Sequence, residues 1–144
     1  MKSLRTLLKV AERNLEMLRR EMAEQIVRQT AIEDRIVGHH QTVAEEQKLA
    51  LRDYESARLY GGYAQAALQA LKALEGQRDA VTAEIERLRT LITEAHVEAR
   101  KFERLIELEE ARQKNAREKR EDAELDEMAT LRAGSRRSAV GSRD

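Results

Sequence analysis

The adjacent histidines His39 and His40 are the residues whose type could hold a metal ion, because imidazole nitrogens are common zinc ligands. Adjacent side chains on a helix point about 100° apart, and neither histidine has a residue of ligand type four positions away. The chain contains no cysteine, which excludes thiolate metal sites and disulfides. We therefore expect no metal site, and interpret the pair as a surface histidine beside a histidine at the helix seam.

Paired carboxylates, which could act as a general acid and base, occur at Glu45-Glu46 and Glu109-Glu110. Both pairs fall in long helical patterns that offer no cleft to shift the pKa of a carboxyl group. No glycine-rich phosphate loop, GxSxG motif or HExxH motif is present in the sequence. The sequence predicts no catalytic residue, no bound cofactor and no enzymatic activity.

The composition is typical of long helices rather than of a broad globular core. Charged residues make up 38% of the 144 residues and aromatic residues 3%, and the apolar residues are regularly spaced. No window approaches the roughly 18 apolar residues of a membrane span, and charges interrupt the start of the chain, where a secretory signal would need an apolar run. We expect a cytosolic chain. Its net charge of zero argues against sequence-independent binding to nucleic acid.

Two apolar patterns with alternating steps of three and four residues run along the chain, which predicts a coiled-coil seam on two helical arms. The first arm contributes Leu4, Leu8, Ala11, Leu15, Leu18, Met22, Ile26, Ile32, Ile36, Val43, Ala50, Tyr54 and Ala57, with Gln29, His40 and Gln47 at or beside seam positions. The second arm contributes Leu68, Leu71, Leu74, Val81, Ile85, Leu88, Ile92, Ala95, Ala99, Phe102 and Ile106, interrupted by Arg78.

Gly61-Gly62 is the only adjacent glycine pair, and the chain has no proline, so we place the reversal between the arms there. The expected fold is all-α: a long two-stranded antiparallel coiled-coil hairpin with the second helix longer than the first. Its domain covers 1–134, with arms at about 3–59 and 64–133 and the turn at 60–63. A basic tail, 135–144, is expected to be disordered. A kink in one continuous helix is the alternative.

Folding about these glycines would pair residue i with about residue 123 − i. At 1.5 Å per residue, the arms would measure ~85 Å and ~105 Å, so the end of the second arm would extend past the first. Leu125, Met128 and Leu131 would then lie on a helix without an intramolecular partner. Residues 1–20 and 112–120, each with a net charge of +4, would form a basic collar beside the acidic residues 121–127.

The chain resembles the flagellar export protein FliJ family. The resemblance is carried by Lys101-Phe102-Glu103-Arg104-Leu105 and by the segment Glu124-Leu125-Asp126-Glu127-Met128-Ala129-Thr130-Leu131-Arg132, which precedes a basic tail. Members of this family are soluble stalks of the flagellar type III export apparatus, similar to the coiled-coil shaft of rotary ATPases. The resemblance covers the whole chain in architecture but only these short pieces in sequence.

The resemblance implies three partners: the hexameric export ATPase, the cytoplasmic domain of the export gate, and export chaperones. It also implies a monomer that inserts its two-terminus end into the ATPase, at the inner face of the cell membrane but without entering it. The ATPase-facing residues would be Leu4, Arg5, Leu8, Lys9, Arg13, Arg117, Lys119, Arg120, Leu125, Met128 and Leu131. The gate-facing residues near the turn would be Ala67, Leu71, Leu74 and Arg78.

The sequence is also compatible with two other functions. One is a structural scaffold or dimerisation module, in which the unpaired end of the second arm joins a second copy of the chain. The other is a clamp on a membrane surface, in which the basic collar meets anionic lipid. Oligomeric state and partner distinguish these alternatives, because a shaft is monomeric alone whereas a scaffold self-associates.

Overall fold

A computed structural model describes residues 2–141 of the chain, and side chains as far as residue 138. It contains two helices, α1 (Lys2–Ala50) and α2 (Tyr54–Gly141), and no strand in the described residues. The expected all-α class and the longer second helix are confirmed. None of the described helices has a stretch long and apolar enough to cross a membrane.

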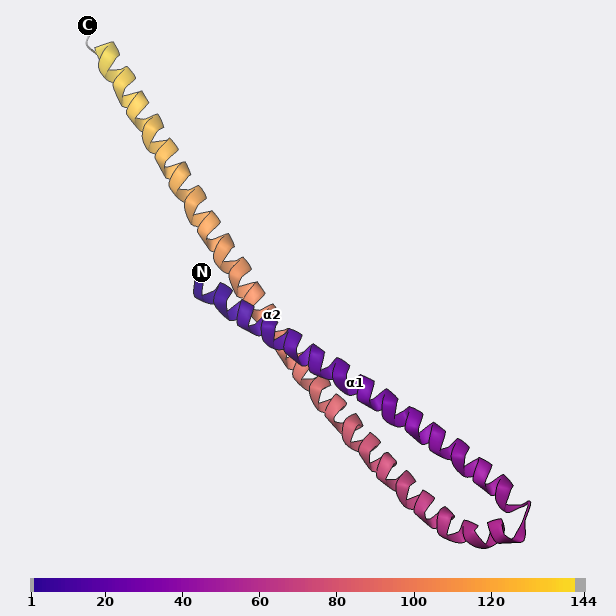
Figure 1. Ribbon diagram of the computed structural model, residues 1–144. Helices are drawn as coiled ribbons and strands as arrows, with labels where there is room; N and C mark the ends of the chain where they lie inside the picture. Colours follow the sequence, from indigo (N-terminus) through magenta and orange to yellow (C-terminus); the bar gives the residue numbers. More distant parts are fainter. Residues whose placement is uncertain (1, 142–144) are drawn as a thin grey trace. The chain divides into compact units, whose positions relative to one another are not determined.

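The contacts divide the chain into two units. The hairpin unit comprises Val10–Glu98, and the terminal unit combines the start of the chain up to Lys9 with the part that begins at Ala99. In the hairpin unit, α1 and α2 lie side by side and run in opposite directions (Figure 1). Its apolar core joins Leu15 and Leu18 of α1 to Leu88 and Ala95 of α2, with Met22, Leu91 and Ile92 packed against them.

The seam follows an unbroken heptad pattern on both helices. The half-buried and buried residues of α1 recur in alternating steps of four and three, at Leu4, Leu8, Ala11, Leu15, Leu18, Met22, Gln25, Gln29, Ile32, Ile36, His39, Val43, Glu46 and Ala50. On α2 the same steps connect buried and half-buried residues, and other half-buried residues such as Leu91 and Glu103 flank this stripe. The stripe consists of Tyr60, Ala64, Ala67, Leu71, Leu74, Arg78, Val81, Ile85, Leu88, Ile92, Ala95, Ala99, Phe102, Ile106 and Glu109. A strict heptad keeps one face of each helix on its partner.

Two apolar positions of the predicted seam are wrong for this reason. The seam passes through Gln25 instead of Ile26, which is 44% exposed, and through Ala67 instead of Leu68, which is 51% exposed. His40 and Gln47, predicted at or beside the seam, lie beside it, next to the seam residues His39 and Glu46. The predicted pattern followed the more apolar residue of each neighbouring pair. Packing along a helix pair instead preserves the heptad spacing, and polar residues are tolerated at some seam positions.

The predicted turn at 60–63 is also wrong. The two helices are joined by Leu51–Asp53, and α2 runs through Gly61 and Gly62 without a positive φ at any glycine of the described residues. The reason is local capping. Asp53 Oδ1 accepts hydrogen bonds from the backbone N–H groups of Glu55 (2.8 Å) and Ser56 (3.3 Å), which makes Asp53 the N-cap of α2. A capped start at Tyr54 outweighs two helix-disfavouring glycines further along.

The far end of α2 differs from the prediction as well. The helix continues through Gly134 and Ser135 to Gly141, so 135–141 are helical instead of forming part of a disordered tail. The remainder of the predicted tail, 142–144, lies outside the described residues. Arginine, alanine and serine tolerate a helix at little free-energy cost, and one glycine costs only ~1 kcal/mol.

Candidate partner-binding site

The main candidate site is the part of α2 that has no companion helix. Every residue from Glu110 to Ser138 is exposed, and Figure 1 shows this part of the terminal unit as a lone helix. We call Glu110–Ser138 the bare helix segment. Its helical form follows from its composition, because it holds no proline and is rich in alanine, glutamate, lysine and arginine. In water, an isolated helix of this kind gains little from packing, so its apolar residues stay in contact with solvent.

Three large apolar residues lie close together on the bare helix segment. Leu125, Met128 and Leu131 are 64%, 52% and 67% exposed. Steps of three residues on an α-helix turn by about 300°, so neighbours in this series lie about 60° apart around the axis and form one ridge. This confirms the expectation that these residues find no partner within the part of the chain that the structure describes. An apolar ridge on an otherwise charged helix is the kind of feature that anchors a helix in a protein partner.

The electrostatic setting of the ridge is divided. Residues 112–120 carry a net charge of +4, and residues 121–127 carry −5. At the boundary with the paired part of the helix, Arg112 Nη2 lies 2.7 Å from Glu109 Oε1. This hydrogen bond lowers the pKa of Glu109 and raises that of Arg112. Both partners of this ion pair are therefore charged around neutral pH. Along the bare helix segment, the basic block 112–120 is followed by the acidic block 121–127.

The basic collar predicted from the sequence is not assembled in this structure. Arg5 Nη2 lies 3.4 Å from Glu110 Oε1, so the first turns of α1 lie beside an acidic part of α2 instead of beside Arg117, Lys119 and Arg120. The predicted pairing sum of 123 had been set by the wrong turn position. Leu4 and Leu8 are half-buried, whereas Lys9 is exposed in the same unit.

Arg13, the remaining residue of the predicted ATPase-facing group, is exposed but belongs to the hairpin unit. The three bases of residues 117–120 are exposed on the bare helix segment together with the ridge. The structure thus brings six of the predicted residues onto one lone helix: Arg117, Lys119, Arg120, Leu125, Met128 and Leu131. It does not bring Leu4, Arg5, Leu8 and Lys9, which belong to the same unit, to them.

The residues predicted to face an export gate lie at the seam of the hairpin unit. Ala67 is buried, and its carbonyl oxygen accepts a 2.8 Å hydrogen bond from His39 Nε2. Leu71, Leu74 and Arg78 are half-buried. Leu71 and Ala67 also line an open groove of about 280 Å³. The rest of its lining is His39, His40, Val43, Gln47, Tyr60, Ala64 and Leu68.

A second groove adjoins the first, and sequence reasoning missed it. Its volume is about 350 Å³, and it shares Tyr60 with the first groove. The lining residues are Glu46, Leu49, Ala50, Ser56, Leu59, Tyr60 and Tyr63. The signal that could have revealed it is Asp53 followed by Glu55, an N-cap signature that moves the turn to this position. Once the turn is placed there, Tyr60 and Tyr63 lie beside Leu49 and Ala50 at the end of α1.

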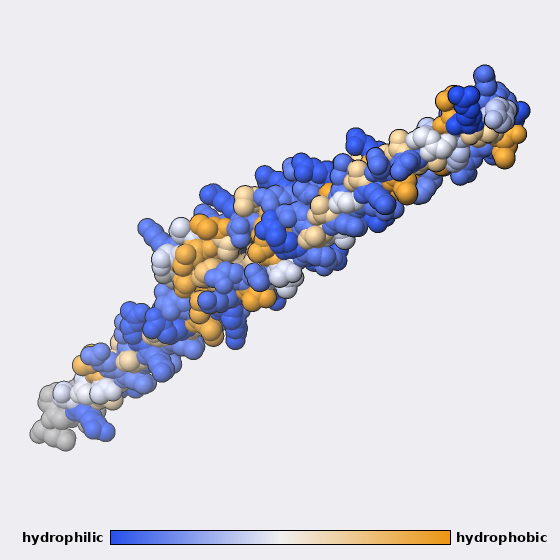
Figure 2. Space-filling view, turned by 90° about the horizontal axis from the view of Figure 1, so that it is seen from below, coloured by the Kyte–Doolittle hydropathy of each residue, from blue (hydrophilic) through white to orange (hydrophobic). Residues whose placement is uncertain are grey.

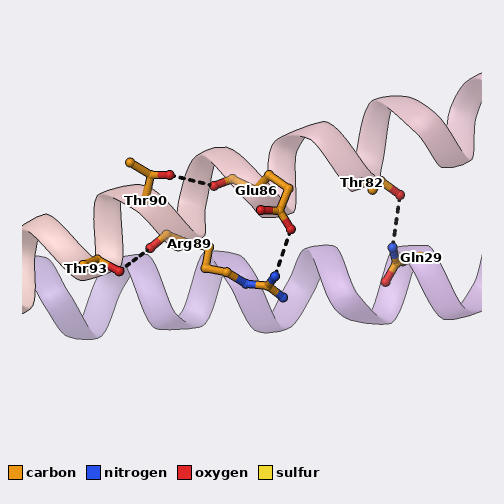
Figure 3. A network of polar contacts seen from close by, with 6 residues as sticks. All are labelled: Gln29, Thr82, Glu86, Arg89, Thr90 and Thr93. Atoms are coloured by element: carbon orange, nitrogen blue, oxygen red, sulfur yellow. Dashed lines mark hydrogen bonds and ion pairs between the residues drawn. The ribbon is translucent and has the colours of Figure 1, made fainter.

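Polar contacts between the helices are few in the hairpin unit. Gln29 Nε2 donates to Thr82 Oγ1 over 3.1 Å and joins α1 to α2 (Figure 3). The other bonds drawn there, Arg89 to Glu86 at 2.8 Å and the threonine hydroxyls to backbone carbonyls, stay within α2. At the surface, hydrophilic side chains cover most of the face visible in Figure 2, and apolar side chains form separate patches.

One of the two adjacent histidines is engaged in a hydrogen bond. His39 and His40 have ring centroids 6.4 Å apart, and Nε2 of His39 is engaged by the Ala67 carbonyl. No group of three or more histidine, aspartate or glutamate side chains gathers around a possible ion in the described part of the chain. The surface features of the described residues are an apolar ridge and two open grooves. No protein-family model, curated protein or solved structure matches this chain.

Proposed function

We propose that this chain is a non-enzymatic adaptor that binds a protein partner through the bare helix segment, and that it serves as a stalk component of the flagellar type III export apparatus. The observation that carries the proposal is the exposed ridge of Leu125, Met128 and Leu131 on a helix without a companion. Burying such a ridge in a ring or cleft would remove apolar area from water, at about 25 cal/mol per Å².

The specific identity of the partner rests on the resemblance to the FliJ family. In this proposal the bare helix segment enters the central hole of the hexameric export ATPase and promotes its assembly and turnover. The grooves of the hairpin unit contact the cytoplasmic domain of the export gate, and export chaperones bind elsewhere on the chain. The protein would then be held at the inner face of the cell membrane by the apparatus, without inserting into the bilayer.

The chain offers a matched pair of variants to test this function. Leu125→Ala with Met128→Ala removes two ridge residues three positions apart. Leu105→Ala with Leu108→Ala removes two exposed leucines at the same spacing on the paired part of α2, where they are 39% and 50% exposed. Binding of each variant to the purified hexameric export ATPase is measured by pull-down, together with ATP turnover and the thermal melt of the variant alone.

The proposal predicts that the ridge variant melts like the native chain but loses at least tenfold in affinity for the ATPase and no longer stimulates it. The Leu105/Leu108 variant should bind and stimulate normally. Equal losses in both variants, or no effect of the native chain on the ATPase, would contradict the proposal. A dimeric native chain, with a melt that drops only in the ridge variant, would instead identify the ridge as the core of a self-associating scaffold.

A further inference from the structure

In the hairpin unit, the residue numbers of facing residues on α1 and α2 add to nearly the same value. The core joins Leu15, Leu18 and Met22 of α1 to Leu88, Ile92 and Ala95 of α2, and pairing these seam positions in antiparallel order gives residue numbers that add to 110. The residue numbers of the Gln29–Thr82 and His39–Ala67 hydrogen bonds add to 111 and 106, within about one helical turn of the same sum. In an antiparallel pair of helices, such a sum defines which residues face each other across the seam.

An unbroken heptad on both helices does not define one register uniquely. Because seam positions repeat every seven residues on α1 and on α2, a sum of 117 or 124 also sets seam residues against seam residues. A change from 110 to 124 displaces the helices by two heptads, about 21 Å. Such registers differ in which side chains meet and in where the chain reverses.

Two of the three charged seam residues, Glu46 and Arg78, have no oppositely charged seam residue facing them in the observed register. Arg78 faces Ile32, and the only carboxylate within ion-pair distance of its guanidinium in the described residues is the neighbouring Asp79, at 3.5 Å. Glu46 lines the groove at the turn together with Tyr60 and Tyr63. In the register that adds to 124, Glu46 and Arg78 face each other. The same register sets Ile32 against Ile92, Ile36 against Leu88, and Val43 against Val81.

The glycine pair independently points to this second register. In a register whose facing residues add to 124, the residue midway between each facing pair is 62, so the reversal would fall at Gly61-Gly62. In the observed structure both glycines lie inside α2, exposed, with open space where a Cβ would be. Neither a close approach nor a positive φ explains glycine there. A reversal does explain it, because glycine is the residue that most readily ends a helix.

From these two observations we propose that the hairpin is bistable, with a second register in which the turn moves from Leu51–Asp53 to Gly61-Gly62 and Glu46 pairs with Arg78. The observed register keeps the Asp53 cap and the apolar partners of Leu15, whose counterpart in the second register is Glu109. The second register relieves the mismatch of Glu46 and Arg78, but it sets the third charged seam residue, Glu109, against Leu15. Helix pairs with two discrete packings are a recognised basis for switching.

The second register would change the terminal unit. Residues 4–9 would then face 115–120, further along α2 than Glu110, the present partner of Arg5, so the bare helix segment would be shorter. It would also bring Arg5 and Lys9 beside Arg117 and Lys119, and break the ion pair of Arg5 with Glu110. The basic collar therefore forms only in the second register, and low salt disfavours that register by repulsion. Leu125, Met128 and Leu131 stay exposed in both.

Cysteine crosslinking reports the register directly, because the native chain has no cysteine. The pair Val43→Cys and Ala67→Cys, whose residue numbers add to 110, forms a disulfide in the observed register. Val43→Cys with Val81→Cys adds to 124 and forms one in the second register. As a measurement that does not trap either state, nitroxide labels at Arg35→Cys and Arg89→Cys, both exposed, are offset by about 21 Å along the axis in the first register and lie opposite each other in the second.

Two variants shift the balance between the registers in opposite directions, and a third is their control; none touches the labelled positions. Gly61→Ala with Gly62→Ala favours helix at the alternative turn and should lower the second-register population about 30-fold. Asp53→Ala removes the cap that exists only in the first register and should raise the second-register population about fivefold. Gly76→Ala, a glycine of α2 with equally open surroundings, is the matched control and should leave the ratio unchanged.

We expect both disulfides to form in the native background, with two distances between the nitroxides, and the second-register signal to grow with salt. The proposal is overturned if the 43–81 disulfide and the short distance are absent even in the Asp53→Ala variant. It is equally overturned if the double alanine variant and the Gly76→Ala control change the ratio alike. All measurements use the isolated full chain, so they are independent of the proposed export function.

Discussion

The amide of Gln29 on α1 donates a 3.1 Å hydrogen bond to the hydroxyl of Thr82, 53 residues further along the chain on α2. Gln29 occupies a seam position that an aliphatic residue would fill in an ideal coiled coil. Because the bond is exposed to water, we expect it to contribute little net stability. The bond instead bears on the register, that is, on which residues of the two helices face each other.

Replacing Gln29 by leucine should therefore stabilise the chain. The leucine buries additional apolar area at the seam, and we expect the free energy of unfolding to rise by about 1 kcal/mol. Urea denaturation followed by circular dichroism measures the change. Thr82→Val, which removes the other partner from an exposed position, is the control and should change the free energy by less than about 0.5 kcal/mol. A loss of stability in Gln29→Leu would show that the hydrogen bond outweighs apolar burial.

Leu88 is the most buried large side chain of the described residues, at 1% exposure. Leu88→Ala removes its packing against Leu15 and Leu18 and should lower the free energy of unfolding by ~2–5 kcal/mol. Leu68→Ala, at a residue of the same helix that is 51% exposed, is the matched control and should cost much less. Thermal and urea melts of both variants test the assignment of the core. Equal effects would mean that Leu68 is buried in solution.

Gly76 lies inside α2, and a Cβ there would meet nothing within 4 Å. Gly76→Ala should raise the free energy of unfolding by about 1 kcal/mol, because alanine loses less backbone entropy in a helix. The measurement is the urea midpoint at an unchanged slope, which separates a gain in stability from a change in the unfolded state. A lower midpoint would place Gly76 outside regular helix.

Glu84 should titrate below its ordinary pKa of 4.5, first because it accepts hydrogen bonds from Arg87, at 2.6 and 3.0 Å, and second because of the positive charge of that side chain. Since the folded pKa lies below the unfolded one, the pair stabilises the fold above the unfolded value, and this stability is lost as pH falls through the folded pKa. The effect on stability is small because both groups are exposed.

Carboxyl chemical shifts measured across an NMR pH titration check this prediction. Arg87→Gln should return the pKa of Glu84 toward 4.5, whereas Arg89→Gln, which removes the partner of Glu86, should leave the titration of Glu84 unchanged. If the pKa of Glu84 is the same in the native chain and in Arg87→Gln, the ion pair is not formed in solution.

Reversing Arg117, Lys119 and Arg120 to glutamate tests the charged part of the proposed interface. These residues are exposed on the bare helix segment, so the variant should fold normally. If the export ATPase is the partner, its association rate constant should fall and become less sensitive to salt, as expected for charges at the rim of an interface. Stopped-flow binding over a range of salt concentrations measures both. An unchanged rate would exclude these bases from the encounter.

The sequence alone determined the helical class, the two arms and much of the seam. Charge content and the regular spacing of Leu15, Leu18, Leu88 and Ile92 admit no other fold class, because a seam with alternating steps of three and four is a property of helices. The exposure of Leu125 and Met128 was also predictable, since the second arm is too long for the first under either position of the turn.

The position of the turn, and with it the register, was decided by the tertiary structure. Heptads repeat, so the apolar pattern is compatible with several registers that differ by seven residues, and a local signal must choose among them. Gly61-Gly62 and Asp53 are competing signals. The cap at Asp53, together with the packing of Leu15 and Leu18 on Ala95 and Ile92, selects the earlier turn. That choice involves residues on both helices, and no single stretch of sequence contains it.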